Sequence, residues 1–302
     1  MNTGYNELKQ TLKGQVALDF PIKDNTYFKI GGMVDAFVEP IDETSLKIAL
    51  KLIKDYDLPF YVIGNGSNLL FSDNGYKGVI IKIGHAFNGI EITDETIKVG
   101  AGTLLSQTAK AAADKDLTGL EFASGIPGYM GGAIAMNAGA YGGEMVNVVD
   151  SVKCMDYDGN SYIFTKEEMG FQYRPSRIFK EGLIVLSTTL KLSKGNKAEI
   201  YATMRDLNER RSSKQPLEKP SAGSTFKRPA QGYAAKLIED TGLKGLRYRG
   251  AMISDKHCGF VVNEDHATAS DVLSLMRIIR ETVYNQHGVL LEPEVRIIGE
   301  DF

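Results

Sequence analysis

The amino-acid sequence predicts a soluble, enzyme-like protein of the α/β or α+β class with two or three domains. Its 302 residues can bury more than one hydrophobic core, and its fractions of hydrophobic (43%) and charged (24%) residues are ordinary for a globular chain. Runs with helical apolar spacing alternate with short strand-like runs, and strand-like runs end in glycine-rich loops. These three observations favour a mixed fold in which a loop at a strand end binds a ligand.

Apolar spacing sets the expected elements up to residue 192. A helix over 42–56 lies between two strand-like runs, as at the start of a βαβ unit. Strands dominate after Val79, apart from a helix at 103–114. The expected strands are 34–38, 60–63, 90–92, 97–99, 148–156, 162–165 and 183–192, with a hairpin turn at Asp158-Gly159.

A polar Ser-Lys-Gly-Asn linker at 193–196 changes the composition, and we expect a domain boundary there. A long helix bearing Ile200, Met204 and Leu207 should follow it. The remaining expected elements are a helix at 234–241, strands near 251–253 and 260–262, and a helix over 270–287 that Gly288 ends.

Composition and charge argue against several classes of function. The net charge of −3, with interspersed signs, is unlike the basic footprint of a nucleic-acid binder. The apolar runs are far shorter than the roughly twenty residues of a membrane span, and the polar start lacks a signal-peptide apolar region. We therefore expect a cytoplasmic protein that binds neither nucleic acid nor a membrane.

The two cysteines, Cys154 and Cys258, are far apart in sequence, which argues against a disulfide framework or a cysteine-rich zinc site. Both are expected to be reduced and structural, and no metal site is expected. His257 stands beside Cys258, but neighbours on a strand point to opposite faces, so we do not expect them to act as nucleophile and base.

The segment 125–143, GIPGYMGGAIAMNAGAYGG, has no charged side chain and ends just before Glu144. Glycine lacks a Cβ and tolerates positive φ, so successive N–H groups can point into one concavity and approach an anion. A short helix at 133–137, just after Gly131 and Gly132, would turn its N–H groups and positive dipole end toward a pyrophosphate. The alternative is a pair of tight turns in a core of small residues.

Two more glycine turns strengthen the ligand interpretation. The run 60–63 leads into Gly-Asn-Gly-Ser-Asn-Leu at 64–69, although Leu69 stands where a Rossmann fingerprint needs glycine, and no P-loop sequence is present. The turn at 100–102 is expected to close the hairpin of 90–92 with 97–99. Three backbone-lined loops predict a large ligand with several phosphates or ring edges.

Six ordered segments resemble the UDP-N-acetylenolpyruvoylglucosamine reductase family, from about Asn25 to Gly299. They are NTYFKIGG (25–32), VIGNGSNLL (62–70), GIPGYMGGAIAMNAGAYGGE (125–144), YRPS (173–176), AGSTFKRP (222–229) and LEPEVRIIG (291–299). The resemblance implies an α+β protein with the vanillyl-alcohol-oxidase/PCMH-type FAD-binding fold. It implies FAD-binding lobes at 1–75 and 76–195 and a substrate-binding domain at 196–288, with the strand at 289–302 returning to the first lobe.

The family reduces an enolpyruvyl ether of a UDP-sugar to the lactyl ether of UDP-N-acetylmuramate, with electrons from NADPH passing through FAD. Hydride addition drives negative charge onto a carboxylate that is already anionic, so a fixed cation and a proton donor are needed. The resemblance gives the cation role to Arg174, the proton donor role to Ser224 and a carboxylate role to Glu294. Taken alone, these are a surface arginine, a loop hydroxyl and an exposed strand carboxylate.

The resemblance also implies binding residues, and FAD is expected to be noncovalent. Substrate binding is expected from Lys214 near the UDP phosphates, Arg228 and Tyr173. The chain resembles the shorter, second type of the family, which lacks an extra substrate-covering loop, so Tyr233 or Tyr248 is a candidate to cover the uridine. Cofactor binding is expected from Asn65, Gly66, Ser67, Asn68, Gly125, Ile126, Pro127, Gly128, Gly131, Gly132, Asn137 and Gly139.

Three functions stay open at this stage. The first is the NADPH-dependent reductase with its UDP-sugar enolpyruvyl ether, as a monomer or weak oligomer. The second is another FAD oxidoreductase of the same fold, and the third is a non-catalytic nucleotide-binding protein. Flavin colour, and the donor that bleaches it, distinguish the three.

Overall fold

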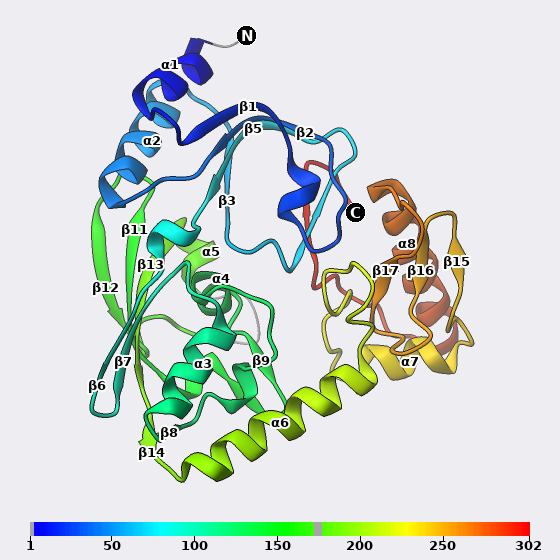
Figure 1. Ribbon diagram of the computed structural model, residues 1–302. Coiled ribbons are helices and arrows are strands. Elements are labelled where there is room, and N and C mark those ends of the chain that lie inside the picture. The colour runs from blue at the N-terminus through cyan, green and yellow to red at the C-terminus, as the bar shows by residue number, and fades with distance from the viewer. Residues whose placement is uncertain (1–2, 172–176) are drawn as a thin grey trace. The chain divides into compact units, whose positions relative to one another are not determined.

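The computed structural model describes residues 3–171 and 177–302, which form two compact units interleaved along the chain (Figure 1). Unit 1 comprises Met1–Leu18, Ala36–Asn65 and Gly78–Arg211, and unit 2 comprises Asp19–Asp35, Gly66–Lys77 and Ser212–Phe302. Among the described residues, no helix combines the length and the apolar character needed to cross a membrane.

A five-stranded sheet in the order β12-β11-β13-β7-β6 organises unit 1, and its neighbouring strands are antiparallel. These strands are β6 (Ile90–Thr93), β7 (Thr96–Gly100), β11 (Val149–Asp156), β12 (Ser161–Thr165) and β13 (Leu183–Lys191). The expected hairpin of β11 with β12 is confirmed. The predicted closure of the β6–β7 hairpin at 100–102 is wrong, because Thr93 pairs with Thr96 around a turn in which Asp94 has φ 51°.

The other elements of unit 1 include helices, short ladders and one strand of a second sheet. They are α1 (Thr3–Thr11), α2 (Glu43–Asp55), β3 (Phe60–Ile63), η2 (His85–Phe87), α3 (Leu105–Asp114), β8 (Leu117–Thr118), η3 (Glu121–Ala123), α4 (Met130–Ala135), β9 (Gly139–Ala140), β10 (Gly143–Glu144), η4 (Met145–Asn147), α5 (Arg177–Glu181) and β14 (Ser193–Lys194). Part of the predicted linker at 193–196 is therefore a strand, which pairs with β8.

The helix expected at 133–137 begins earlier than predicted, at Met130, and contains Gly131 and Gly132. Packing explains the glycine at 131, since a Cβ there would lie 3.1 Å from the Ala101 Cβ and 3.6 Å from the Val185 Cβ. This close contact with β13 and the loop after β7 overrides the low helix propensity of glycine.

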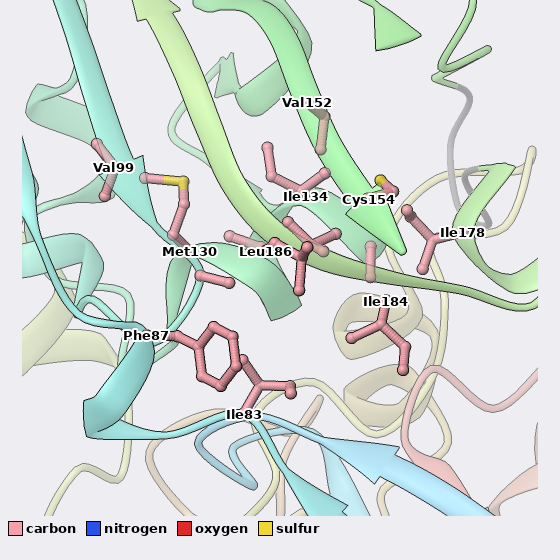
Figure 2. Close-up of a cluster of buried hydrophobic side chains, with 14 of the residues drawn as sticks. Ile83, Phe87, Val99, Met130, Ile134, Val152, Cys154, Ile178, Ile184 and Leu186 are labelled. Atoms are coloured by element: carbon pink, nitrogen blue, oxygen red, sulfur yellow. The ribbon is translucent and has the colours of Figure 1, made fainter. Parts of the chain in front are cut away.

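One part of the core of unit 1 lies where α4 meets β13. Figure 2 shows Met130 and Ile134 of α4 with Leu186 of β13, and Phe87 and Ile83 close this cluster at one end. All five side chains are buried. The core therefore fixes the glycine-rich loop that leads into α4.

Four elements cross the boundary between the units along the chain: β1 (Val16–Pro21), β2 (Met33–Val38), β5 (Tyr76–Lys82) and α6 (Lys197–Lys214). The three strands join β3 in a sheet of order β1-β2-β5-β3. Helix α2 was predicted from its apolar spacing, and its first turn is capped by Asp42, whose side chain accepts the Ser45 N–H.

Unit 2 pairs one long helix with a small sheet of order β15-β16-β17. Its elements are η1 (Ile22–Asn25), β4 (Leu69–Phe71), α7 (Ala234–Asp240), β15 (Arg247–Tyr248), β16 (Ala251–Ile253), β17 (Val261–Asn263), α8 (Ala269–His287) and β18 (Arg296–Ile298). Helix α8 begins at a capping box of Thr268 with Asp271. It ends, as predicted, at Gly288, which is in the left-handed conformation. Strand β18 pairs in parallel with β4.

Candidate functional site

Three loops of unit 1 lie against one another: the loop after β3, the loop after β7 and the glycine-rich loop before α4. The Met130 N–H donates to the Thr103 carbonyl (2.8 Å), and the Leu105 N–H donates to the Gly128 carbonyl (3.0 Å). From the first loop, Asn65 Nδ2 donates to the Pro127 carbonyl (2.9 Å). The structure thus brings together the loops that the sequence singled out as backbone-lined.

Two glycines in and before the loop after β7 allow another close approach of the backbone, to the segment that contains η2 (His85–Phe87). A Cβ on Gly102 would lie 1.9 Å from the Gly84 carbonyl oxygen, and one on Gly100 would lie 2.1 Å from the Phe87 carbonyl oxygen. Because these obstacles are backbone atoms, they cannot rotate away. Gly100 and Gly102 are therefore required for the end of β7 and the loop after it to approach the segment of Gly84 and Phe87.

Gly132 is different, because a Cβ there would meet nothing within 4 Å. Among residues 3–171 and 177–302, neither the Gly132 N–H nor the Gly125 N–H has a hydrogen-bond acceptor. Main-chain donors without an acceptor, beside a glycine with open space, suit a bound anion. The arrangement fits the diphosphate of a dinucleotide such as FAD.

Asn137 has φ 42° and a buried side chain that is used within the chain. Its Oδ1 accepts the Val146 N–H (3.0 Å), and its Nδ2 donates to Glu144 Oε2 (3.0 Å). Gly139 pairs with Glu144 in the β9–β10 ladder. In the structure, Asn137 holds the end of the glycine-rich segment in shape.

Helix α6 supplies two residues that sequence reasoning missed. A Cβ on Gly125 would lie 2.5 Å from Asn208 Oδ1 and 3.0 Å from Arg211 Cδ, and Asn208 Nδ2 donates to Ser124 Oγ (3.3 Å). Burial lowers the pKa of the Arg211 guanidinium, and only the nearby Tyr141 phenol opposes this shift. In the sequence, the NERRSSK run looks like a solvated helix face, so nothing there marked Arg211.

In unit 2, Thr225 connects the segments of Ser224 and Glu294. Thr225 was not singled out from the sequence. The Thr225 carbonyl accepts the Glu294 N–H (2.8 Å), and Thr225 Oγ1 accepts the Val261 N–H (2.9 Å). The half-buried Ser224 hydroxyl has no hydrogen-bond partner within the described parts of the chain. Thr225 thus fixes the backbone on which Ser224 stands.

Asn68 extends this cluster. Its Nδ2 donates to the Glu294 carbonyl (3.1 Å), and its own carbonyl accepts the Arg296 N–H (3.0 Å). Gly66, with φ 69°, accepts the Tyr27 N–H (3.1 Å) through its carbonyl, and Ser67 between them is half-buried.

The expected substrate-binding residues are only partly placed. The Arg228 guanidinium carbon lies 4.1 Å from the centre of the exposed Tyr233 ring. Lys214 is exposed at the end of α6, and its charge adds to burial in lowering the pKa of His257. Tyr173 and Arg174 lie outside the described residues.

Both cysteines are free and buried. Burial raises the pKa of the Cys154 thiol to about 12, which suits a structural role. Cys258 lies with His257 in the turn between β16 and β17 rather than on a strand, and His257 Nδ1 accepts the Gly259 N–H (3.1 Å).

Comparison with known proteins identifies the family. Residues 34–164 match an FAD-binding domain, and residues 215–298 match the UDP-N-acetylenolpyruvoylglucosamine reductase C-terminal domain. The chain is 51% identical over 296 residues to UDP-N-acetylenolpyruvoylglucosamine reductase of Clostridioides difficile, with 98% of this chain and 97% of the relative covered. The chain belongs to the UDP-N-acetylenolpyruvoylglucosamine reductase family. A relative of that name from Alkaliphilus oremlandii is 50% identical over 95% of this chain and 94% of its own length.

Solved structures agree with this UDP-N-acetylenolpyruvoylglucosamine reductase fold. The Thermus caldophilus reductase (MurB) matches with a TM-score of 0.81 and 37% identity, over 94% of this chain and 98% of that chain. Physcomitrella patens BBE-like 1 shares the fold alone, with a TM-score of 0.50 and 17% identity over 63% of this chain and 44% of its own. The expected α+β chain with a vanillyl-alcohol-oxidase/PCMH-type FAD-binding fold is confirmed.

Proposed function

We propose that this chain uses NADPH and FAD to reduce UDP-N-acetyl-3-O-(1-carboxyvinyl)-glucosamine to UDP-N-acetylmuramate, a step of peptidoglycan precursor synthesis. The observation that carries this function is the nearly full-length similarity to relatives named for the reaction, across both the FAD-binding and the C-terminal domain. FAD, when bound, supplies the two-electron chemistry that passes hydride from NADPH to the vinyl carbon.

The chain's own residues control charge and protons in this reaction. Hydride addition places extra negative charge on the substrate carboxylate, and the rigid fork of the Arg174 guanidinium is suited to neutralise it. Ser224 donates the proton to the internal carbon. Its freedom from other hydrogen bonds among the described residues leaves the hydroxyl available, while Thr225 holds its backbone. Glu294, whose segment lies beside that of Ser224, supplies the carboxylate of the site.

Binding is assigned along the same lines. FAD is held noncovalently, with its diphosphate at the glycine-rich loop of unit 1, and Lys214 takes the UDP phosphates. Tyr233, exposed beside Arg228, is the candidate to cover the uridine. Because NADPH and a nucleotide sugar are its proposed substrates, we expect the enzyme in the cytoplasm, as a monomer or weak oligomer.

Anaerobic half-reactions test this function. The purified chain should be yellow, bleach with NADPH and recover its colour with the UDP-enolpyruvyl sugar. Bleaching by an alcohol donor, without recovery by the sugar, would instead indicate another FAD oxidoreductase. A colourless chain that binds no flavin would indicate a nucleotide-binding protein.

Ser224→Ala separates the proton donor from a structural role. We expect NADPH-driven bleaching to stay within about twofold of wild type, while reoxidation by the sugar falls by at least about 100-fold. Ser270→Ala, at an exposed position of α8, is the control and should leave both steps unchanged. Equal loss in both half-reactions of Ser224→Ala would contradict the assigned role.

A further inference from the structure

Arg211 has an unusual setting for a charged residue of a mainly exposed helix. Its side chain is half-buried and lies against Gly125, where its Cδ would be 3.0 Å from a Cβ at that position. Its sequence neighbour Arg210 is exposed and pairs with Asp206 through an N–O contact of 2.8 Å. Two adjacent arginines of one helix therefore have different surroundings.

No counter-charge accompanies the partly desolvated guanidinium. Within residues 3–171 and 177–302, Arg211 makes neither an ion pair nor a side-chain hydrogen bond, and its one electrostatic neighbour is the Tyr141 phenol. Partial burial removes water from a cation, and proteins usually compensate that loss with a partner. The missing partner is therefore expected to be a ligand.

The surroundings define the chemistry of that ligand. The N–H of Gly125, the residue against which the Arg211 side chain lies, has no acceptor among the described residues. A free main-chain donor beside a guanidinium suits a phosphate oxygen, which guanidinium binds with paired N–H groups. No carboxylate of the described chain pairs with Arg211 to compete for it.

Tyr141 adds a second, independent sign of a built site. It occupies the two-residue turn between β9 and β10 with φ 53°, followed by Gly142 with φ 87°. Such a turn favours asparagine or glycine, so a tyrosine there is conformationally disfavoured. The turn keeps the phenol near the guanidinium, and we read this as positioning of Arg211.

We propose that Arg211 binds the diphosphate of FAD from the α6 side of the glycine-rich loop, with Tyr141 as its positioning residue. This inference rests on the proposed function only in taking FAD as the cofactor. It gives α6 a cofactor-binding role in addition to its role as the link into unit 2.

The test compares Arg211→Gln with Arg210→Gln in the full-length holoprotein. Flavin fluorescence released on dilution gives the FAD dissociation constant, and circular dichroism verifies folding. We expect Arg211→Gln to weaken FAD binding by about 10- to 100-fold and to flatten the dependence of that constant on salt, because a charge-assisted hydrogen bond is lost. Arg210→Gln should match wild type.

Riboflavin, which lacks phosphates, shows whether the loss of affinity arises at the diphosphate of FAD. Arg211→Gln should bind riboflavin as wild type does, and Arg211→Lys, which keeps the charge without the fork, should lie between wild type and Arg211→Gln for FAD. If Arg211→Gln does not fold, the Arg211→Lys comparison carries the test alone.

The outcomes separate this inference from the proposed function. Unchanged FAD affinity with a raised KM for the UDP-sugar or NADPH would assign Arg211 to another diphosphate and overturn the inference. Unchanged FAD affinity and unchanged KM would overturn it as well. A wild-type chain that binds no flavin at all would instead defeat the proposed function.

Discussion

Replacing Thr225 with valine should loosen the part of unit 2 that carries Ser224. Thr225 is 3% exposed and Val261 1% exposed, so the Val261 N–H that Thr225 Oγ1 accepts cannot turn to water. Valine has nearly the shape of threonine, so little cavity forms. An unsatisfied buried N–H costs about 1–3 kcal/mol, and the added methyl group returns up to about 0.8 kcal/mol. The net loss is about 1–2 kcal/mol.

Hydrogen exchange measured by mass spectrometry can detect this loss of stability in the affected part of unit 2. A loss of about 1–2 kcal/mol makes opening about 5–30 times more frequent, so peptides covering Val261–Asn263 should exchange faster by that factor. Peptides covering Val149–Asp156 in unit 1 serve as the internal reference and should not change. Thr225→Ser keeps the acceptor and is the matched variant. Equal exchange in the valine and serine variants would refute the reasoning.

Three further predictions concern Arg174, Cys154 and Asp114. Arg174→Lys should lose at least about 100-fold in kcat for the sugar, because a point charge does not reproduce two-point carboxylate recognition. Arg177→Lys is the control and should stay near wild type. Near-normal turnover of the Arg174 variant would contradict this prediction. Cys154, whose pKa burial raises to about 12, should resist iodoacetamide at about pH 8 in the native chain and react after denaturation; peptide mapping that finds rapid native labelling would argue against it. The pKa of Asp114 is lowered to about 2 by hydrogen bonds from Lys110 and Tyr201, so its ionised form stabilises the fold above the unfolded value and this contribution fades as pH falls toward about 2. The urea midpoints of wild type and Asp114→Asn should therefore differ near neutral pH and converge in acid; a difference independent of pH would disprove this.

The long helices were predictable because local signals agreed with packing. Helix α8 has its buried face at Val272, Leu275, Met276 and Ile279, and its end at Gly288 was readable from the sequence. The start of α4 was not predictable from the sequence. Glycine is an unfavourable helix residue, and Gly131 is explained only by the close approach of Ala101 and Val185 in the folded chain. Local propensity cannot report such a contact.

The candidate site divides in the same way. The glycine loops were found because backbone approach requires glycine itself, and the family motif pointed to Ser224 and Glu294. Thr225 and Arg211 were missed because their significance lies in partners far along the chain. Thr225 joins residues 261 and 294, and Arg211 of α6 meets Gly125 in the glycine-rich loop. Neither contact leaves a periodic trace in the sequence.

The parallel pairing of β4 with β18 has a consequence for the order in which unit 2 is completed during synthesis. Asn68 must wait for Glu294, 226 residues later, before its side chain gains that acceptor. Until then, the ribosome-bound chain carries β4 without its neighbour. An excised fragment beginning at Ser212 would have the opposite defect, because β18 would lack a template and α8 would lose Asp73, which accepts the Ala269 N–H. Attempts to dissect this protein should therefore keep all three segments of unit 2 on one polypeptide.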